Sequence, residues 1–230
     1  MRKISHRQKK NFEKITDYIF SDLEKAIKIL KKTATTKFIE TVEAHINLNI
    51  DPKYADQQLR TTVTLPNGTG KYIRIAVLTN QSNIDEIKSA GADLIGNENL
   101  IEEISQGLIN FDLLIATPDM MPKLAKLGRI LGPKGLMPSP KSGTVSTTLI
   151  KTLIDFKKGK FEYKADKTGI VHVSFGRSDF TEIQLIENLK TLYNSIEQNR
   201  PIGVKGKYFK SLFICTTMGP SLQIDLNIFA

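Results

Sequence analysis

The hydrophobic pattern of this chain differs between its middle and its two ends, and this difference constrains the fold more than any single motif. Residues 41–50 alternate strictly between apolar and polar side chains, and alternation returns in residues 161–175. Residues 72–158 instead contain continuous apolar runs, namely IRIAVL, ADLIG and FDLLIAT. Alternation is typical of a strand with one buried face, whereas a continuous run is typical of a strand buried on both faces. The chain therefore predicts two sheets of different kinds.

The middle region is expected to form an inserted domain, residues 68–158, with a parallel, Rossmann-like α/β sheet. Strands that alternate with helices favour this doubly wound arrangement. Glycines mark the two places where the chain enters and leaves the region, at Pro66–Gly70 and at Lys157–Lys160, which suggests a hinge of two strands. The expected helices lie near residues 83–90, 98–108 and 118–127.

The two ends of the chain are expected to fold together into an outer α+β domain, made of residues 1–67 and 159–230. Apolar residues at steps of three and four predict helices, and alternation predicts strands. The sum is an antiparallel sheet with helices on its apolar face. The expected elements are helices at 11–32 and 180–197, a strand at 41–50, a hairpin of 161–165 with 171–175, and strands at 211–217 and 222–228.

The charge of the chain favours a polyanion as its partner. The 33 Lys and Arg residues outnumber the 24 Asp and Glu residues, which gives a formal net charge of +9. Cations are concentrated in residues 1–37 and 123–164, so two basic clusters could converge on one phosphate backbone. No run of about eighteen apolar residues occurs, so no membrane span is expected.

Neither metal binding nor cysteine chemistry is expected from the sequence. His6, His45 and His172 lie on separate segments, and with a single cysteine they offer no zinc-ligand spacing. Because Cys215 is the single cysteine, the chain cannot form an intramolecular disulfide, which fits a reducing compartment. We interpret Cys215 as a packing residue of a strand and not as a nucleophile with a histidine partner. We therefore expect no metal and no cofactor.

An enzymatic site has little support in the sequence. The stretch Asn67–Lys71 is similar to a phosphate-binding loop, but Leu65 stands where that motif needs glycine, and Tyr72 where it needs Ser or Thr. No pair of carboxylates is placed by its spacing to act as acid and base. The α/β class of the inserted domain keeps one enzymatic alternative open, since such domains often bind nucleotides at the carboxyl ends of their strands.

The stretch from Leu127 to Val145, LGRILGPKGLMPSPKSGTV, combines four glycines and three prolines with no acidic residue. Its composition excludes a helix interior and a central strand, and favours an ordered cationic loop. With the preceding residues it forms ATPDMMPKLAKLGRILGPKGLMP, which resembles the signature of the ribosomal protein L-one family. Further matches are TATTKFIETVEA at 33–44, DPKYADQQLRTTVTLPNGTGK at 51–71 and TTMGPS at 216–221, so the resemblance covers nearly the whole chain.

The resemblance implies an RNA-binding surface on the outer domain, where the start of the first strand lies beside the turn between the last two. The residue types suit this role, because Lys binds phosphate, aromatic and Met side chains pack on ribose and bases, and hydroxyl and carboxylate groups contact the ribose hydroxyl. Gly permits a close approach of the backbone. The implied RNA-binding residues are Lys37, Phe38, Thr41, Glu43, Asp166, Lys167, His172, Ser211, Thr217, Met218 and Gly219.

The resemblance further implies a structural protein of the large ribosomal subunit, present there as a monomer. Its expected partners are the large-subunit (23S-type) rRNA of the mobile stalk and the exit-site tRNA whose release it assists. The leader of its own mRNA is a candidate target of repression. A composition rich in Lys, Asn and Ile hints at a plastid genome, with the bacterial cytoplasm as the alternative location. A nucleotide-binding enzyme and a generic basic interaction module remain as alternatives from other classes.

Overall fold

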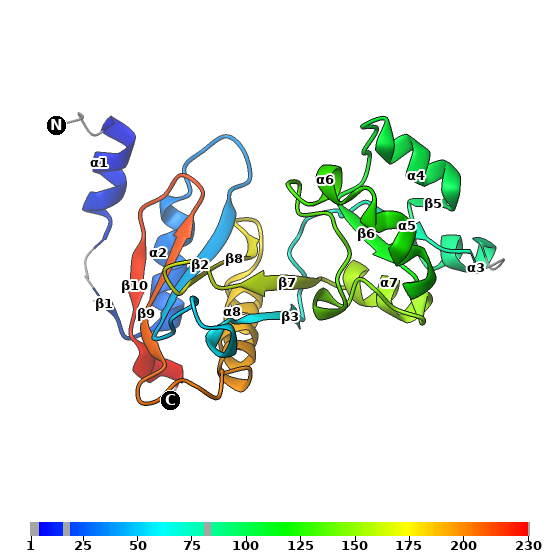
Figure 1. Ribbon diagram of the computed structural model, residues 1–230. Coiled ribbons are helices and arrows are strands. Elements are labelled where there is room, and N and C mark those ends of the chain that lie inside the picture. The colour runs from blue at the N-terminus through cyan, green and yellow to red at the C-terminus, as the bar shows by residue number, and fades with distance from the viewer. Residues whose placement is uncertain (1–4, 16–18, 81–83, 230) are drawn as a thin grey trace. The chain divides into compact units, whose positions relative to one another are not determined.

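The computed structural model describes residues 5–15, 19–80 and 84–229 (Figure 1). The chain divides into two compact units, of which unit 1 contains residues 1–70 and 162–230 and unit 2 contains residues 71–161. The expected domain limits lie three residues before these divisions. None of the helices among the described residues is long and apolar enough to cross a membrane.

Unit 1 is built on a five-stranded sheet in the order β1-β10-β9-β2-β8. All neighbouring strands are antiparallel except β1 and β10, which are parallel, so the expected antiparallel sheet is mixed at one edge. The strands are β1 (Ile19–Phe20), β2 (Thr41–Leu48), β8 (Ile170–Arg177), β9 (Phe209–Thr216) and β10 (Leu222–Ile224).

The alternating pattern of residues 41–50 places β2 in the sheet as predicted. Val42, Ala44, Ile46 and Leu48 are fully buried, while the polar residues between them stay partly exposed. The buried face is covered by α2 (Leu23–Thr33) and α8 (Glu182–Gln198), which pack against each other and against the sheet (Figure 1). The polar side chains of the other face are therefore available for binding.

The single helix predicted for residues 11–32 is wrong. Two helices, α1 (His6–Glu13) and α2, are separated by β1, with residues 16–18 outside the described part of the chain. The second helix, α2, starts after Asp22, because the Asp22 carboxylate accepts hydrogen bonds from the backbone amides of Glu24 and Lys25 and caps the helix. β1 pairs with β10, so a contact with the far end of the chain replaces local helical hydrogen bonds.

The predicted hairpin of residues 161–165 and 171–175 is also corrected. The two strands share one isolated bridge, between Ala165 and Val171, and then separate. β7 (Lys160–Lys164) forms a two-stranded sheet with β3 (Arg60–Thr64), while β8 pairs with β2. β7 and β8 therefore each pair with a strand that is distant in the sequence and not with each other.

The last predicted strand, at residues 222–228, is shorter than expected. β10 ends at Ile224, and a 3-10 helix, η4 (Leu226–Phe229), follows it. The Phe229 ring stacks on Tyr193 of α8 with the ring centroids 4.3 Å apart. Packing of this ring on α8 accompanies the bend in the chain that ends the strand.

Unit 2 contains the predicted parallel sheet, in the order β5-β4-β6. Side chains of β4 alternate between two cores, since Ala76 and Leu78 belong to one and Ile75 and Val77 to the other. Helices cover both faces, as expected of a doubly wound domain. The elements are β4 (Ile75–Leu78), α3 (Ile84–Ser89), β5 (Leu94–Gly96), α4 (Glu98–Ser105), β6 (Leu113–Ala116), α5 (Met121–Ala125), α6 (Gly128–Leu131) and α7 (Leu149–Lys157), with short 3-10 helices at Ala55–Gln57 in unit 1 and at Pro118–Met120 and Pro140–Ser142 in unit 2.

The glycine- and proline-rich stretch from Leu127 to Val145 is ordered and mostly irregular, as predicted. It does contain one helical turn of four residues, α6. The stretch closes on β6 through a bridge between Val145 and Ala116. Its cations Arg129, Lys134 and Lys141 are exposed.

Candidate nucleic-acid interface

The start of β2 and the turn after β9 are held together by a compact set of hydrogen bonds. The Thr217 amide donates to the Thr41 carbonyl at 3.1 Å, and the Thr41 amide donates to the Thr217 hydroxyl at 3.0 Å. That hydroxyl also donates to the Thr41 carbonyl at 3.3 Å. Residues 36–41 and 216–219 therefore form one structural element, which we call the joint.

Glu40 is the buried acid of the joint, with only 1% of its surface exposed. Its carboxylate accepts hydrogen bonds from the Met218 amide at 3.0 Å and from the Thr36 hydroxyl at 2.9 Å. Burial acts to raise the pKa of Glu40, but the hydrogen bonds, led by that of Met218, outweigh burial and hold the pKa below its ordinary value. The acid therefore stays ionised and connects the two segments.

Glu40 was not among the residues expected from the sequence, although a signal for it exists. It stands in the same alternating register as Val42 and Ala44, whose side chains face the core. An acid at the edge of a buried register requires hydrogen-bond donors from elsewhere in the fold, because an unpaired buried charge is costly. An acidic residue in the register of a strand's buried side chains is therefore a sequence signal for such a hydrogen-bonded carboxylate.

Gly219 is required by the shape of the turn. A Cβ atom at this position would lie 2.3 Å from the Thr216 hydroxyl oxygen, well inside van der Waals contact. The Gly219 amide donates to the Thr216 carbonyl at 3.1 Å, which closes the turn. The missing side chain thus serves a contact within the protein.

The joint presents apolar side chains to solvent. Phe38 is 54% exposed and Met218 is 47% exposed, one on each segment of the joint. Phe38 is therefore a surface residue and not a core aromatic. Lys37 beside it is exposed as well. The surface combines a cation, an aromatic ring and a thioether above a buried carboxylate.

The polar face of the sheet carries Glu43 and His172 on neighbouring strands. His45 lies opposite His172 in the register of β2 and β8, and their Nδ1 atoms are 2.8 Å apart. Burial lowers the pKa of His45, and the nearby His172 adds to this effect, while Glu43 opposes it. His45 is thus held largely in its neutral form at neutral pH.

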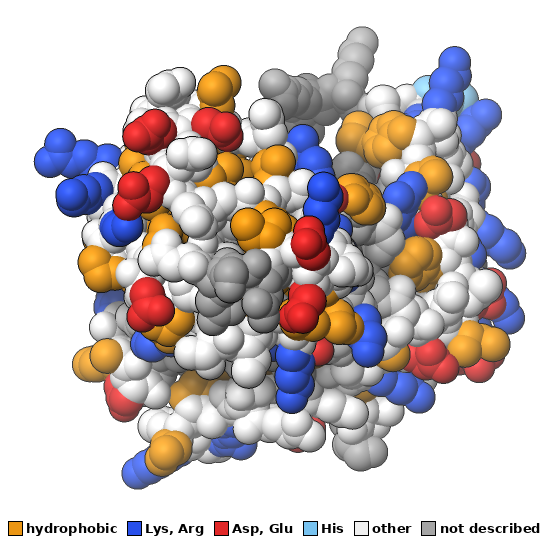
Figure 2. All heavy atoms as spheres, turned by 90° about the vertical axis from the view of Figure 1, so that its right-hand side faces the viewer, with side chains coloured by type: hydrophobic (Ala, Val, Ile, Leu, Met, Phe, Trp, Pro, Cys, Tyr) orange, Lys and Arg blue, Asp and Glu red, His pale blue; other side chains and the backbone are white. Residues whose placement is uncertain are grey.

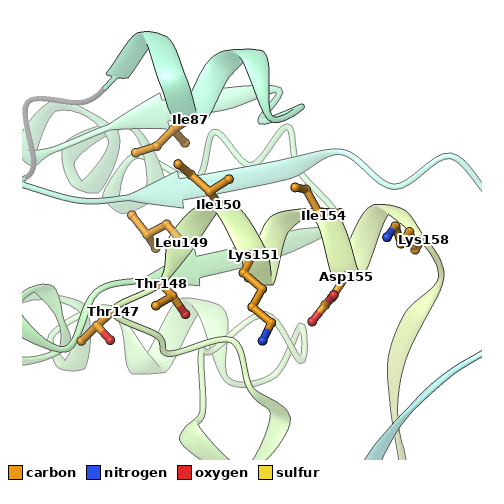
Figure 3. A pocket seen from close by; sticks show the side chains of 9 residues that line it. All are labelled: Ile87, Thr147, Thr148, Leu149, Ile150, Lys151, Ile154, Asp155 and Lys158. Carbon is orange, nitrogen blue, oxygen red and sulfur yellow. The ribbon is translucent and has the colours of Figure 1, made fainter.

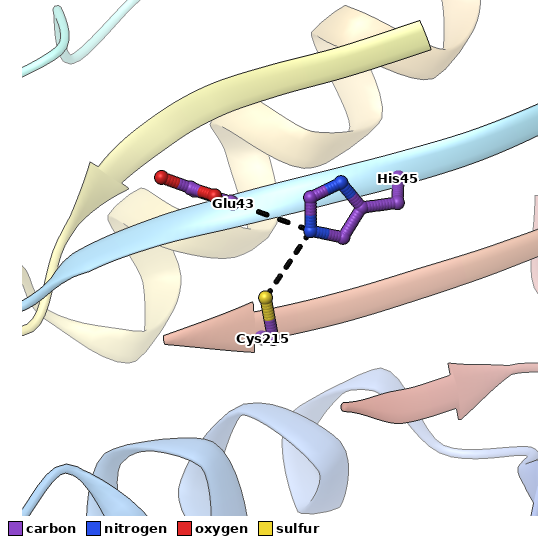
Figure 4. A group of neighbouring side chains, drawn as sticks. All are labelled: Glu43, His45 and Cys215. Carbon is purple, nitrogen blue, oxygen red and sulfur yellow. Dashed lines mark hydrogen bonds and ion pairs between the residues drawn. The ribbon is translucent and has the colours of Figure 1, made fainter. Parts of the chain in front are cut away.

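Cys215 was interpreted as a packing residue of a strand, but its side chain is partly exposed and has a histidine partner. The register of β2 and β9 places Cys215 opposite Glu43, and its Sγ lies 3.2 Å from His45 Nε2 (Figure 4). Burial, with a contribution from Glu43, raises the pKa of the thiol, so the group is not an activated nucleophile. Strand pairing brings these residues together, which their spacing in the sequence does not indicate.

Three of the expected residues lie at the other end of the sheet. Ser211 pairs with Asn47, six residues along β2 from Thr41, which corresponds to about 20 Å. Asp166 and Lys167 precede β8 in a turn, where the Asp166 carboxylate accepts from the Ile170 amide at 2.8 Å. That hydrogen bond is the main reason why the pKa of Asp166 is lowered. The joint therefore gathers Lys37, Phe38, Thr41, Thr217, Met218 and Gly219, with Glu43 next along β2 and His172 farther along the polar face.

Unit 2 has a surface groove of about 600 Å³ between α3 and α7. Its walls include Ile87, Leu149, Ile150 and Ile154, whereas Lys151 and Asp155 point away from these apolar side chains (Figure 3). The lining comes from helices and from residues 147–148 and not from the carboxyl ends of the strands, where the enzymatic alternative needs its site. The face shown in Figure 2 mixes cations, acids and apolar side chains instead of gathering one charge.

Comparisons with known proteins give a consistent result. Residues 30–220 match the model of the Ribosomal protein L1p/L10e family. The large ribosomal subunit protein uL1c of Trieres chinensis is 77% identical over 229 residues, and that of Phaeodactylum tricornutum is 72% identical over 230 residues, each covering 100% of both chains. The large ribosomal subunit protein uL1 of Prochlorococcus marinus (strain MIT 9215) is 59% identical over 227 residues, which is 99% of this chain and 96% of that protein. The range matched by the family model contains every residue expected to contact RNA.

Proposed function

The chain belongs to the ribosomal protein L1p/L10e family, and from this premise we propose that it binds the large-subunit rRNA of the mobile stalk through the joint of unit 1. As a structural constituent of the ribosome, it is not an enzyme. The observation that carries the proposal is the exposure of Phe38 and Met218 on two segments that the buried Glu40 holds together. An exposed aromatic ring and thioether beside Lys37 suit the packing of ribose and bases next to a phosphate.

The Thr217 hydroxyl can contribute to RNA binding through a lone pair that no group in the described part of the protein uses. The hydroxyl donates its proton to the Thr41 carbonyl and accepts from the Thr41 amide, so one acceptor position remains. A ribose 2′-hydroxyl is a donor of matching chemistry, and it distinguishes RNA from DNA. Glu43, with a partly exposed carboxylate on the same face, can accept from a second ribose hydroxyl or from a base amine.

His172, Ser211, Asp166 and Lys167 form the second part of the proposed RNA surface. They follow the polar face toward its other end, so a structured RNA that contacts both parts would extend along the sheet. Lys167 is exposed and supplies a cation for phosphate. Asp166 acts mainly by shaping the turn that presents Lys167, because its carboxylate is occupied by the Thr168 and Ile170 amides.

In the ribosome, we place the protein as a monomer in the stalk near the exit site, where it assists release of deacylated tRNA. Repression of its own mRNA would use the same surface, if the leader of that mRNA copies the ribosomal site. The greater similarity to the uL1c proteins than to the bacterial relative supports a plastid ribosome as its location.

The proposal is tested by comparing the affinity of the whole chain for a stalk rRNA fragment with its affinity for an unrelated structured RNA of equal length. We expect much tighter binding of the stalk fragment at the same salt concentration. Equal affinities would instead favour a generic basic interaction module. We expect no thermal stabilisation of the chain by a nucleotide.

A further inference from the structure

Glu43, His45 and Cys215 bring a carboxylate, an imidazole and a thiol together on the polar face of the sheet. One possible ligand atom from each lies within 4.8 Å of the other two. Glu43 and His45 are two residues apart on β2 and therefore share a face, and Cys215 lies opposite Glu43 on β9 (Figure 4). All three side chains are partly exposed, so an ion from solvent can reach them.

The spacing of these atoms is close to that of a tetrahedral zinc site. Bond lengths of about 2.3 Å to sulfur and about 2.0–2.2 Å to nitrogen and oxygen imply separations of about 3.6 Å between N and S and about 3.3 Å between N and O. His45 Nε2 lies 3.2 Å from Cys215 Sγ and 4.0 Å from a Glu43 carboxylate oxygen. Changes of several tenths of an ångström, within reach of side-chain rotation, would complete the geometry.

The other nitrogen of His45 is held by a partner of the kind that orients metal-binding imidazoles. His45 Nδ1 lies 2.8 Å from His172 Nδ1, and His172 Nε2 lies 3.7 Å from an Asp166 carboxylate oxygen. If Asp166 keeps the proton of His172 on Nε2, His172 Nδ1 accepts from the Nδ1–H of His45. The lone pair of His45 Nε2 then points toward Cys215 and Glu43, as a metal ligand requires.

From this arrangement we propose that Glu43, His45 and Cys215 bind one Zn²⁺ ion on the polar face, with water at the fourth position. A thiolate, an imidazole and a carboxylate form a donor set that suits Zn²⁺. The ion displaces the proton of the Cys215 thiol, which passes to solvent, and its charge stabilises the resulting thiolate. Asp166 and His172 are positioning residues and do not contact the ion.

The zinc site goes beyond the proposed RNA function. Each of the two proposals can be confirmed or refuted without the other. The two would nevertheless meet at Glu43, because a carboxylate bound to Zn²⁺ is less available as an acceptor for a ribose hydroxyl. A bound ion would also add positive charge to a face that is proposed to contact RNA.

The test is a titration of the metal-free whole chain with Co²⁺, which takes the place of Zn²⁺ and reports thiolate ligation by a charge-transfer absorption. We expect one Co²⁺ per chain with this absorption, and its loss when Zn²⁺ is added. Cys215→Ser should abolish the absorption, and His45→Gln should weaken binding strongly. His6→Gln is the matched control, since His6 belongs to α1, and should bind Co²⁺ as the natural chain does.

A positioning role for His172 predicts that His172→Gln weakens metal affinity by roughly 10- to 100-fold while the thiolate absorption remains. If a variant fails to fold, the natural chain still decides the question, because bound Zn²⁺ should slow alkylation of Cys215 by iodoacetamide. Absence of the thiolate absorption, unchanged affinity in Cys215→Ser, or equal alkylation with and without Zn²⁺ would overturn the proposal.

Discussion

The buried carboxylate of Glu40 accepts a hydrogen bond of 3.0 Å from the backbone amide of Met218, a residue 178 positions later in the chain. This contact fixes the turn after β9 against the segment that precedes β2. Because the same segments carry the exposed Phe38 and Met218 side chains, the shape of the proposed RNA surface depends on an acid that RNA does not touch.

Replacing Glu40 by Gln should destabilise the chain by about 1–3 kcal/mol at neutral pH. The amide group of Gln would turn a donor toward either the Met218 amide or the Thr36 amide, neither of which can accept, and one hydrogen bond would be lost. The pKa of Glu40 is lowered in the fold, so its stabilisation is present above the ordinary value of 4.5 and is lost as the pH falls through the folded value.

Urea denaturation of both chains between pH 7 and pH 3.5 measures this difference. We expect the gap between the natural chain and Glu40→Gln to be constant near neutrality and to shrink below pH 4.5. Glu197→Gln, which alters an exposed glutamate of α8, should match the natural chain. A gap of the same size at every pH would show that the charge of Glu40 contributes nothing.

Gly219→Ala should weaken RNA binding by displacing the turn. The new methyl group would lie 2.3 Å from the Thr216 hydroxyl oxygen, and the turn must move to relieve this contact. Thr216→Ala removes that oxygen, so Gly219→Ala should cost less affinity in the Thr216→Ala background than in the natural chain. A double-mutant cycle measures the coupling. Additive effects would rule out this contact as the reason for the glycine.

Asp93 should stabilise unit 2 at neutral pH. Burial acts to raise its pKa, but hydrogen bonds from Lys157, Tyr72 and the Ile75 amide outweigh burial and lower the pKa from 3.8 to about 2. Asp93→Asn should therefore cost about 1 kcal/mol at pH 7, because solvent around this exposed residue screens its charge interactions. Because the folded pKa is depressed, the difference should persist down to pH 3.8 and be lost as the pH falls toward 2.

Chemical denaturation of the natural chain and Asp93→Asn from pH 7 to pH 3 tests this, with the exposed Asp119 replaced by Asn as the control. We expect Asp119→Asn to follow the natural chain within a few tenths of a kcal/mol. If Asp93→Asn were as stable as the natural chain at pH 7, the hydrogen bonds of Asp93 would merely offset the cost of its burial.

Lys37→Ala should lower both the affinity for stalk rRNA and its salt dependence. Each phosphate contact adds roughly 0.7 to 0.9 to the slope of log affinity against log salt concentration. The loss of one contact should therefore reduce the slope by about that amount. Lys205→Ala is the control, because Lys205 is exposed in the loop before β9, at the opposite end of that strand from the joint. Equal slopes for both variants would remove Lys37 from the proposed site.

Alternating and continuous apolar patterns predicted the two kinds of sheet because each pattern reflects how many faces of a strand are buried. Val42, Ala44 and Ile46 follow the rule without exception. The rule failed for residues 11–32, where the apolar spacing continues through β1. Ile19 and Phe20 pair with Gln223 and Ile224. The local sequence pattern cannot predict pairing with a strand about two hundred residues away.

The grouping of side chains on the polar face could not be predicted from the sequence either. His45, His172 and Cys215 have no informative spacing, and they meet only because β2 lies between β8 and β9 in a particular register. The residues of the joint were predicted through a family resemblance, but their arrangement around Glu40 was not. Extending the alternation of β2 back by one residue, to Glu40, would have pointed to it, since Glu40 falls in the register of the buried side chains.

The central claim, that the joint packs against RNA, is tested most directly by the affinity of Phe38→Ala and Met218→Ala for stalk rRNA. Both side chains are exposed and uncharged, so each loss should cost about 1–3 kcal/mol of binding with the thermal stability and the salt slope unchanged. Ile202→Ala, which truncates an exposed apolar side chain in the segment between α8 and β9, should bind as the natural chain does. Natural affinity in both Phe38→Ala and Met218→Ala would contradict the account.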